Sequence, residues 1–143
     1  MIIKQLSIFV ENKHGRMAEI TKTLADKGVD IRALSIADTT DYGILRLIVD
    51  HPEDAVLALK DEKMTVALTE VIAISVPDVP GGLSKAVEAL SAGGIDIEYM
   101  YASLNSKDDS AFVILRVEDN EKAVSVLEKA GVKLMCGSEI YNV

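Results

Sequence analysis

The segment 6–36 of this chain recurs at 72–102, shifted by 66 residues, and this internal repeat constrains the fold more than any other feature. Gly15 recurs as Gly81, and the run Gly-Val-Asp-Ile at 28–31 recurs as Gly-Ile-Asp-Ile. A repeat at a fixed spacing indicates that one structural unit occurs twice, so each copy serves as a comparison for the other.

The repeat continues beyond this segment with a small change of shift. Leu45 matches Val113, and Leu59 matches Leu127, in both cases 68 residues further along the chain. Two additional residues therefore lie in the polar segment 105–109 of the second copy. A surface hairpin between two strands tolerates such an insertion.

The length of the repeat predicts two small modules. A chain of 143 residues would usually form one domain, but we expect one module over residues 1–69 and another over residues 70–143. A module of this size buries only about 60% of the surface of its unfolded chain, so its core alone is marginal. The two copies should therefore pack together.

Composition restricts the classes of function. The net charge of −8 and the lack of Lys and Arg clusters argue against a nucleic-acid partner, since phosphate binding relies on such clusters. No apolar run approaches the roughly 20 residues of a membrane span, so no membrane association is expected. Residues 1–6 lead directly into strand-like sequence without a secretory signal, and the single Cys136 agrees with a reducing compartment. We therefore expect a cytoplasmic protein.

Apolar periodicity predicts the same order of elements in both copies. Leu6, Ile8 and Val10 alternate with their neighbours as in a half-buried strand, and Ile20 and Leu24 follow at helical spacing. The second copy repeats both patterns. We expect strands at 6–10, 29–37, 44–49, 65–68, 72–76, 95–104, 111–118 and 132–136. We expect helices over 17–24 and 83–90, and two further helices that begin near residues 52 and 120.

This β-α-β-β-α-β order predicts a ferredoxin-like sandwich, in which four antiparallel strands carry both helices on one face. The fold class is therefore α+β, with two tandem ferredoxin-like modules packed side by side into a continuous antiparallel sheet with helices on one face. The junction 68–71 leaves almost no linker between the copies. The tail 138–143 has strand character, and we expect it to pair with an open sheet edge.

The turn between the first strand and the first helix of each copy carries the clearest functional signal. It covers residues 11–17 in the first copy and 77–83 in the second. A helix start offers unpaired backbone N–H groups and the positive end of the helix dipole, and it can therefore hold a carboxylate. The side chain of Asn12 or Asp78 could then hold the ammonium group of the same ligand.

Two interpretations of this turn remain open. In the first, the amides and the side-chain oxygen together bind a zwitterion. In the second, Asn12 and Asp78 only cap their helices, and the glycines only form the turn, because residues of these types commonly do so.

The same residues resemble the ACT domain signature. In the first copy an apolar strand leads into Asn-Lys-His-Gly-Arg-Met-Ala-Glu-Ile at 12–20 and Gly-Val-Asp-Ile at 28–31. The second copy, with Asp-Val-Pro-Gly-Gly-Leu at 78–83 and Gly-Ile-Asp-Ile at 94–97, resembles the signature more closely because it keeps the Pro-Gly pair. The resemblance covers nearly the whole chain as two tandem copies.

ACT domains are regulatory modules that bind amino acids or other small metabolites between paired domains. The resemblance implies that the ligand lies between the turn of one domain and the second strand of its neighbour, without a cofactor. The implied turn residues are Asn12, His14, Gly15, Arg16 and Met17 in the first copy and Asp78, Val79, Gly81, Gly82 and Leu83 in the second, with Ser35, Ile36, Tyr99, Met100 and Tyr101 on the strands.

The two copies differ inside the turn, where His14 and Arg16 stand in the places of Pro80 and Gly82. The larger polar residues of the first copy either add contacts to the ligand or block that site. A single loop histidine without further donors at ligand spacing does not predict a metal site, so we expect no bound metal.

Tyr99 and Tyr101 lie on one face of their strand, because alternate residues of a strand share a face. They pack against the other copy or another subunit, or they stack on a ligand. Both roles hold if the site lies at that interface.

Catalysis is not expected. The sequence contains no nucleophile elbow and no phosphate-binding loop, and Cys136 lacks a histidine partner because His14 and His51 fall in distant turns.

We therefore expect a stand-alone tandem ACT regulatory protein that binds a free amino acid at the inter-domain or inter-subunit interface and signals to a partner. The alternative is a ligand-free assembly scaffold, or a regulatory subunit of an amino-acid biosynthetic enzyme similar to the acetolactate synthase small subunit. A sheet with helices on one side leaves apolar surface to cover, so we also expect a homodimer.

Overall fold

The computed structural model describes residues 2–11, 13–38, 41–105 and 109–141. The chain divides into two compact units, one of residues 4–69 with residue 141, and one of residues 2–3 with 70–140; we call them the first and second modules. The elements are β1 (Ile2–Glu11), α1 (Arg16–Asp26), β2 (Ile31–Asp38), β3 (Tyr42–Val49), α2 (Pro52–Asp61), β4 (Thr65–Pro77), α3 (Gly82–Ala92), β5 (Ile97–Asn105), β6 (Ser110–Val117), α4 (Asn120–Lys129), β7 (Lys133–Met135) and α5 (Gly137–Tyr141).

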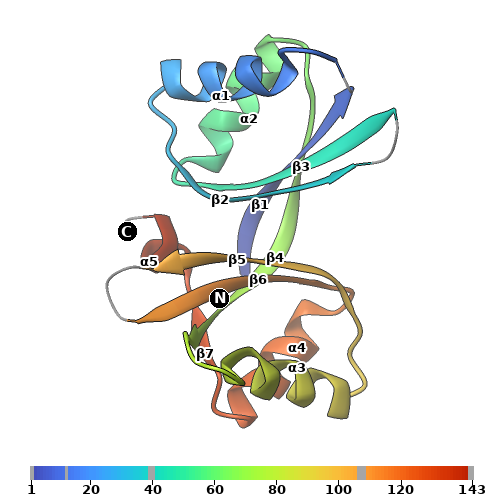
Figure 1. Ribbon diagram of the computed structural model, residues 1–143, viewed down its shortest axis with the longest axis vertical. Helices are drawn as coiled ribbons and strands as arrows, with labels where there is room; N and C mark the ends of the chain where they lie inside the picture. Colours follow the sequence, from blue (N-terminus) through green and yellow to red (C-terminus); the bar gives the residue numbers. More distant parts are fainter. Residues whose placement is uncertain (1, 12, 39–40, 106–108, 142–143) are drawn as a thin grey trace. The chain divides into compact units, whose positions relative to one another are not determined.

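The first module is an antiparallel sheet with two helices on one face (Figure 1). Its strands follow the order β2-β3-β1, and β4 lies next to β1. Leu45 of β3 lies opposite Ile8 on one side and Ile36 on the other. The core between the sheet and α1 and α2 contains Leu6, Ile8, Val10, Ile20, Leu24, Val29, Leu45, Leu47, Val49, Ala55, Leu59, Met64 and Val66.

The second module repeats this arrangement, with α3 and α4 on one face of its strands (Figure 1). Its strands follow the order β5-β6-β4, and β7 pairs with the other side of β4. The core contains Ile72, Ile74, Val76, Ala86, Leu90, Ile95, Val113, Leu115, Val117, Ala123 and Leu127. The α+β class and the two ferredoxin-like modules are thus confirmed.

One strand differs from the expected pattern. The sequence predicts two separate strands at 65–68 and 72–76, but β4 runs without interruption from Thr65 to Pro77. The intervening residues contain no glycine or proline, so nothing in their backbone preferences ends the strand.

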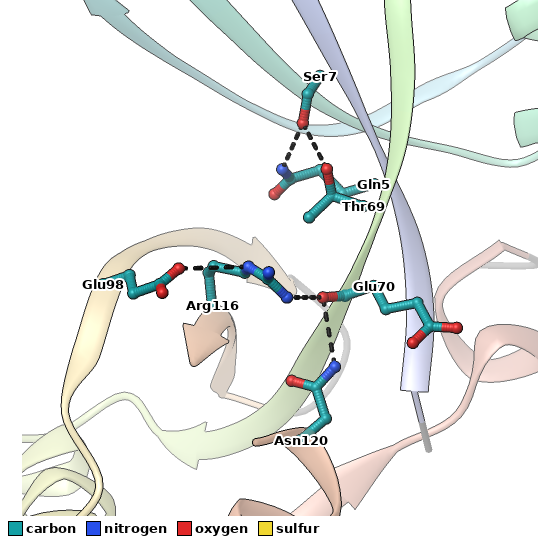
Figure 2. Close-up of polar contacts among 7 residues, drawn as sticks. All are labelled: Gln5, Ser7, Thr69, Glu70, Glu98, Arg116 and Asn120. Atoms are coloured by element: carbon teal, nitrogen blue, oxygen red, sulfur yellow. Dashed lines mark hydrogen bonds and ion pairs between the residues drawn. The ribbon is translucent and has the colours of Figure 1, made fainter. Parts of the chain in front are cut away.

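Polar contacts hold β4 at its middle. In the first module the Thr69 hydroxyl lies 2.9 Å from Ser7 Oγ, and Ser7 Oγ also accepts a hydrogen bond from the buried Gln5 side chain at 3.1 Å (Figure 2). In the second module, Arg116 donates to the backbone carbonyl of Glu70 at 3.0 Å.

The prediction for the tail is wrong, because Gly137–Tyr141 form the short helix α5 rather than a strand. The Glu139 carboxylate accepts a hydrogen bond from the backbone N–H of Cys136 at 2.9 Å, which stabilises the start of this helix. Ile140 is buried at 1% exposure. A local side-chain acceptor and one buried apolar residue therefore outweigh the strand preference of the segment.

Candidate functional site

The helix that follows the first strand of each module begins at a glycine. Gly15 precedes α1 with φ of 82°, and Gly81 precedes α3 with φ of 83°. This left-handed conformation strains other residue types, so glycine is required by the backbone at both positions. The nearly equal angles show that both helices start from the same glycine conformation, although the flanking side chains differ.

The N-cap residues of both helices are glycines, so no N-cap side chain closes these helix starts in the described part of the chain. The backbone N–H groups of Met17 and Leu83, in the first turns, make no hydrogen bond to another residue of the described chain. In contrast, the Asp119 carboxylate caps α4 by accepting from the N–H of Lys122 at 3.0 Å. The interpretation of Asp78 as a capping residue is therefore wrong, whereas Asn12 lies outside the described residues.

In the first module, the turn and the second strand line a common cleft of about 160 Å³. It brings together Arg16, Met17 and Ile36, three of the residues implied by the resemblance. Met17 is 37% exposed and Ile36 is 52% exposed, so apolar surface remains available there. The cleft is completed by Val10, Glu11, Lys13, Tyr42, Gly43 and Leu45.

Charged groups of both signs lie in this cleft. The Lys13 ammonium lies 2.7 Å from a Glu11 carboxylate oxygen, and the Arg16 guanidinium lies 3.1 Å from a Glu19 carboxylate oxygen. The hydrogen bond from Lys13, and then the charge of Lys13, hold the pKa of Glu11 below its usual range. Glu11 therefore presents a carboxylate, and Arg16 a cation, within the same small cleft.

Glu11 and Tyr42 were not predicted individually as site residues. Tyr42 lies opposite Glu11 in the pairing of β1 with β3, and its ring centroid is 5.1 Å from that of Phe9. An aromatic residue at the first position of the third strand, opposite the last residue of the first strand, is the pattern that could have identified this pair.

Ser35, Tyr99 and Tyr101, which the resemblance implies as ligand-binding residues, lie on the sheet face away from the helices of their module. Directly opposed residues of antiparallel strands share a face. Ser35 lies opposite Arg46, whereas Ile36 lies opposite the core residue Leu45.

The second module shows the same division. Tyr99 lies opposite Arg116 and Tyr101 opposite Ile114, whereas Met100 lies opposite the core residue Leu115. Within each module, therefore, Ile36 and Met100 share the helix side with the turn, while Ser35, Tyr99 and Tyr101 do not.

The turn of the second module is open to solvent. Asp78 and Val79 are exposed, Val79 at 59%, and the Asp78 backbone N–H donates to the carbonyl of Asp109 at 3.0 Å. Leu83 is half-buried against the core, and Gly82 lines a cavity on the side of the turn that faces β7. In the first module, His14 is exposed.

Two further observations concern metals and membranes. The described residues contain no group of three or more His, Cys, Asp or Glu side chains placed to hold a metal ion. None of the helices formed by the described residues is long and apolar enough to cross a membrane.

The topology and the glycine-led helix starts define a tandem pair of ferredoxin-like modules. The family model described as an ACT domain pair matches residues 1–142, so the chain belongs to the ACT domain family, a family of regulatory domains. A comparison with curated proteins finds no match.

Solved structures share this fold. Protein BT0572 from Bacteroides thetaiotaomicron is 45% identical, with a TM-score of 0.94, over 100% of this chain and 98% of that protein. The ligand-free regulatory subunit of aspartate kinase from Thermus thermophilus is 18% identical, with a TM-score of 0.65, over 91% of this chain and 97% of that chain. The regulatory subunit of aspartate kinase from Thermus flavus is 17% identical, with a TM-score of 0.63, over 92% of this chain and 95% of that chain.

Proposed function

We propose that this protein binds a free amino acid at its glycine-led helix starts and passes the occupancy of the site to a partner protein. The single observation that carries this proposal is the pair of uncapped helix starts. Each leaves backbone N–H groups without a described acceptor, and in the first module these groups border a cleft with charges of both signs.

The chemistry of the turn matches the two ends of an amino acid. The N–H groups of Met17 and Leu83 lie at the positive ends of their helix dipoles, where a carboxylate is stabilised. Glu11 in the first module and Asp78 in the second supply a carboxylate for the ammonium group. In the first module, Ile36 supplies apolar surface for the side chain of the ligand.

We propose that a neighbouring ACT module completes the site with its second strand, as the family resemblance implies, either in the same chain or in a second copy. Met100 is the strand residue suited to this role, because it is exposed and lies on the helix side of its strand, whereas Ile36 lines the cleft of its own module. A homodimer would then place a residue of each copy against the ligand of the other.

Signalling requires differential binding. A ligand shifts an equilibrium between two arrangements of a protein only by the difference in its affinity for them. Regulatory subunits of aspartate kinase have the same fold, and we propose by analogy that the partner is an enzyme of amino-acid metabolism.

Calorimetry with each of the twenty amino acids tests this proposal. We expect saturable binding of at least one amino acid, weakened about tenfold in Asp78→Ala or Glu11→Ala, because each variant removes a charged acceptor. Asp54→Ala, an exposed carboxylate in α2, is the matched control and should bind as the unmodified protein does. Absence of heat with every amino acid would contradict the proposal.

One observation favours the second candidate, an assembly scaffold. The outer strand β2 exposes Leu34 at 56% and Ile36 at 52%, and exposed apolar side chains on an edge strand promote association. Sedimentation analysis separates the two candidates. A stable dimer that is unchanged by all twenty amino acids, together with no calorimetric signal, would favour the scaffold.

A further inference from the structure

The two modules differ in the space behind the helix-start turn, on the side that faces the last strand. In the second module a cavity of about 410 Å³ lies between α3, the end of β4 and the segment that leads into β7. The matching position in the first module is a cavity of about 90 Å³. Most lining residues of the two cavities are equivalent positions of the repeat, so this difference arises within a shared architecture.

Two glycines account for the larger space. Gly82 and Gly131 of the second module stand where the first module has Arg16 and Lys63, at shifts of 66 and 68. The backbone is alike at the second of these positions, because Lys63 has φ of 61° and Gly131 has φ of 74°. The cavity is therefore larger where two long side chains are missing.

Two lysines line this cavity. The ammonium nitrogen of Lys85 on α3 lies 3.9 Å from the position of a Cβ added to Gly131, so this side chain extends across to the segment before β7. Lys133 lines the cavity from β7, and its ammonium lies 3.7 Å from a Glu139 carboxylate oxygen. Among the described lining residues Asp109 is the single carboxylate, so cations outnumber anions.

The two lysines of this cavity have no cationic equivalents in the first module. The equivalents of Lys85 and Lys133 are Glu19 and Thr65, at shifts of 66 and 68. The cations of the first module's cavity are Arg16 and Lys63, whose side chains stand where the second module has glycines. The second module therefore combines cations with open space.

The remaining walls are partly apolar. Val76 and Ala86 are buried at 6% and 1% exposure, Val132 is half-buried, and Ser110 contributes a half-buried hydroxyl. A volume of about 410 Å³ lies within the range of about 300–1,000 Å³ that small-molecule sites occupy. Apolar walls with cations alongside suit a carbon skeleton that bears a negative charge.

We propose that this cavity is a second binding site, specific to the second module, for a small organic carboxylate. The carboxylate contacts the ammonium groups of Lys85 and Lys133, and the carbon skeleton lies against Val76, Ala86 and Val132. The site shares only Gly82 with the amino-acid site proposed above and does not depend on it.

An NMR titration of the whole protein, labelled with ¹⁵N, tests this site with succinate as the probe. We expect saturable shifts at millimolar succinate for the backbone N–H signals of Gly82, Lys85, Gly131 and Val132. Inorganic phosphate carries charge but no carbon skeleton, so we expect its affinity to be lower by about tenfold. Equal affinity for phosphate would overturn the assignment to organic acids, and no saturable shift with succinate would overturn the site.

Variants identify the groups responsible. The double variant Lys85→Gln, Lys133→Gln should weaken succinate binding by about tenfold or more, because it removes both cations. The double variant Lys122→Gln, Lys129→Gln on α4 makes the same change of charge outside the cavity and should bind as the unmodified protein does. Equal losses in the test and control variants would overturn the proposal.

Variants also separate the test of this cavity from the test of the amino-acid site. Asp78→Ala should leave succinate binding unchanged, and the double lysine variant should leave amino-acid binding unchanged. Failure of one site therefore leaves the other site standing.

Discussion

The two modules are alike where they are buried and differ where they meet solvent. Leu24 and Leu90 occupy the same core position at 0% exposure, and the glycines that start α1 and α3 have nearly the same φ. In the turn itself, Arg16 corresponds to Gly82. Close packing fixes the core positions in both copies, whereas the turn accepts side chains of different size and charge, and this is where the two copies can acquire different ligands.

A second difference lies at the opposite end of the modules. In the first module the Asp50 carboxylate accepts a hydrogen bond from the N–H of Asp30 at 2.8 Å, and the Asp50 N–H donates to the Asp30 carbonyl at 3.1 Å. Their equivalents Glu118 and Asp96 form no such bond among the described residues, and both line a cavity of about 920 Å³. The two modules thus differ at this end as well as at the turn.

The largest expected effect tests the equivalence of the two cores. Leu24→Ala and Leu90→Ala should each lower the free energy of unfolding by about 2–5 kcal/mol, because each leaves a cavity in a closed core. Urea denaturation measures this loss. Leu57→Ala, at a site 64% exposed, is the control and should cost less than about 0.5 kcal/mol. The equivalence fails if either core variant loses no more stability than the control.

The next effect concerns the turn. A Cβ on Gly82 would collide with the backbone carbonyl oxygen of Pro77, so Gly82→Ala should destabilise the protein by about 1–3 kcal/mol. Arg16→Ala at the equivalent position should cost about 0.5 kcal/mol, since Arg16 is half-buried and its partner Glu19 is exposed. Thermal or urea unfolding of both variants compares them, and equal losses would show that the turns have the same steric constraint.

The smallest effect concerns the loop contact of the first module. Asp50→Ala should lower the free energy of unfolding at neutral pH by about 1 kcal/mol, because the N–H of Asp30 loses its acceptor. Glu118→Ala in the second module is the matched variant and should cost less than about 0.5 kcal/mol. Similar losses of stability in both variants would contradict the proposed difference between the two modules at this end.

The contribution of the Asp50 carboxylate to stability should depend on pH. Burial alone would raise the pKa of Asp50, but hydrogen bonds from the Asp30 N–H and from His51, together with the charge of His51, outweigh burial and lower it. A carboxyl group whose pKa is lower in the folded state stabilises the protein above its unfolded pKa and loses this effect as pH falls through the folded value. The difference in the free energy of unfolding between the unmodified protein and Asp50→Ala should therefore be largest at neutral pH and shrink below about pH 4.

Much of the fold follows from the sequence because the repeat and the apolar periodicity express burial directly. Ile72, Ile74 and Val76 alternate in the sequence, and all three lie in the core of the second module. The continuity of β4 was not predicted, although residues 69–71 contain no glycine or proline. The helix α5 was not predicted because its buried residue depends on the folded chain. Ile140, for example, is buried in a segment with strand-like composition.

The candidate site was predicted only in part. The glycines were placed correctly in the turn because a positive φ restricts the choice of residue. Tyr99 and Tyr101 were assigned to one face of their strand, but not to a particular face, so they were grouped with Met100 although they point to the other side of β5. The cavity beside β7 needs residues 82, 85 and 131–133 together, and their proximity depends on the folded chain.

The central claim is that the uncapped N–H groups at the starts of α1 and α3 hold the carboxylate of an amino acid. An NMR titration with the amino acid that gives the largest heat measures this directly. The account predicts saturable shifts of the N–H signals of Met17 or Leu83, while the N–H of Lys122, already bonded to Asp119, stays unchanged. Binding that shifts neither helix start, or no binding of any amino acid, would contradict the account.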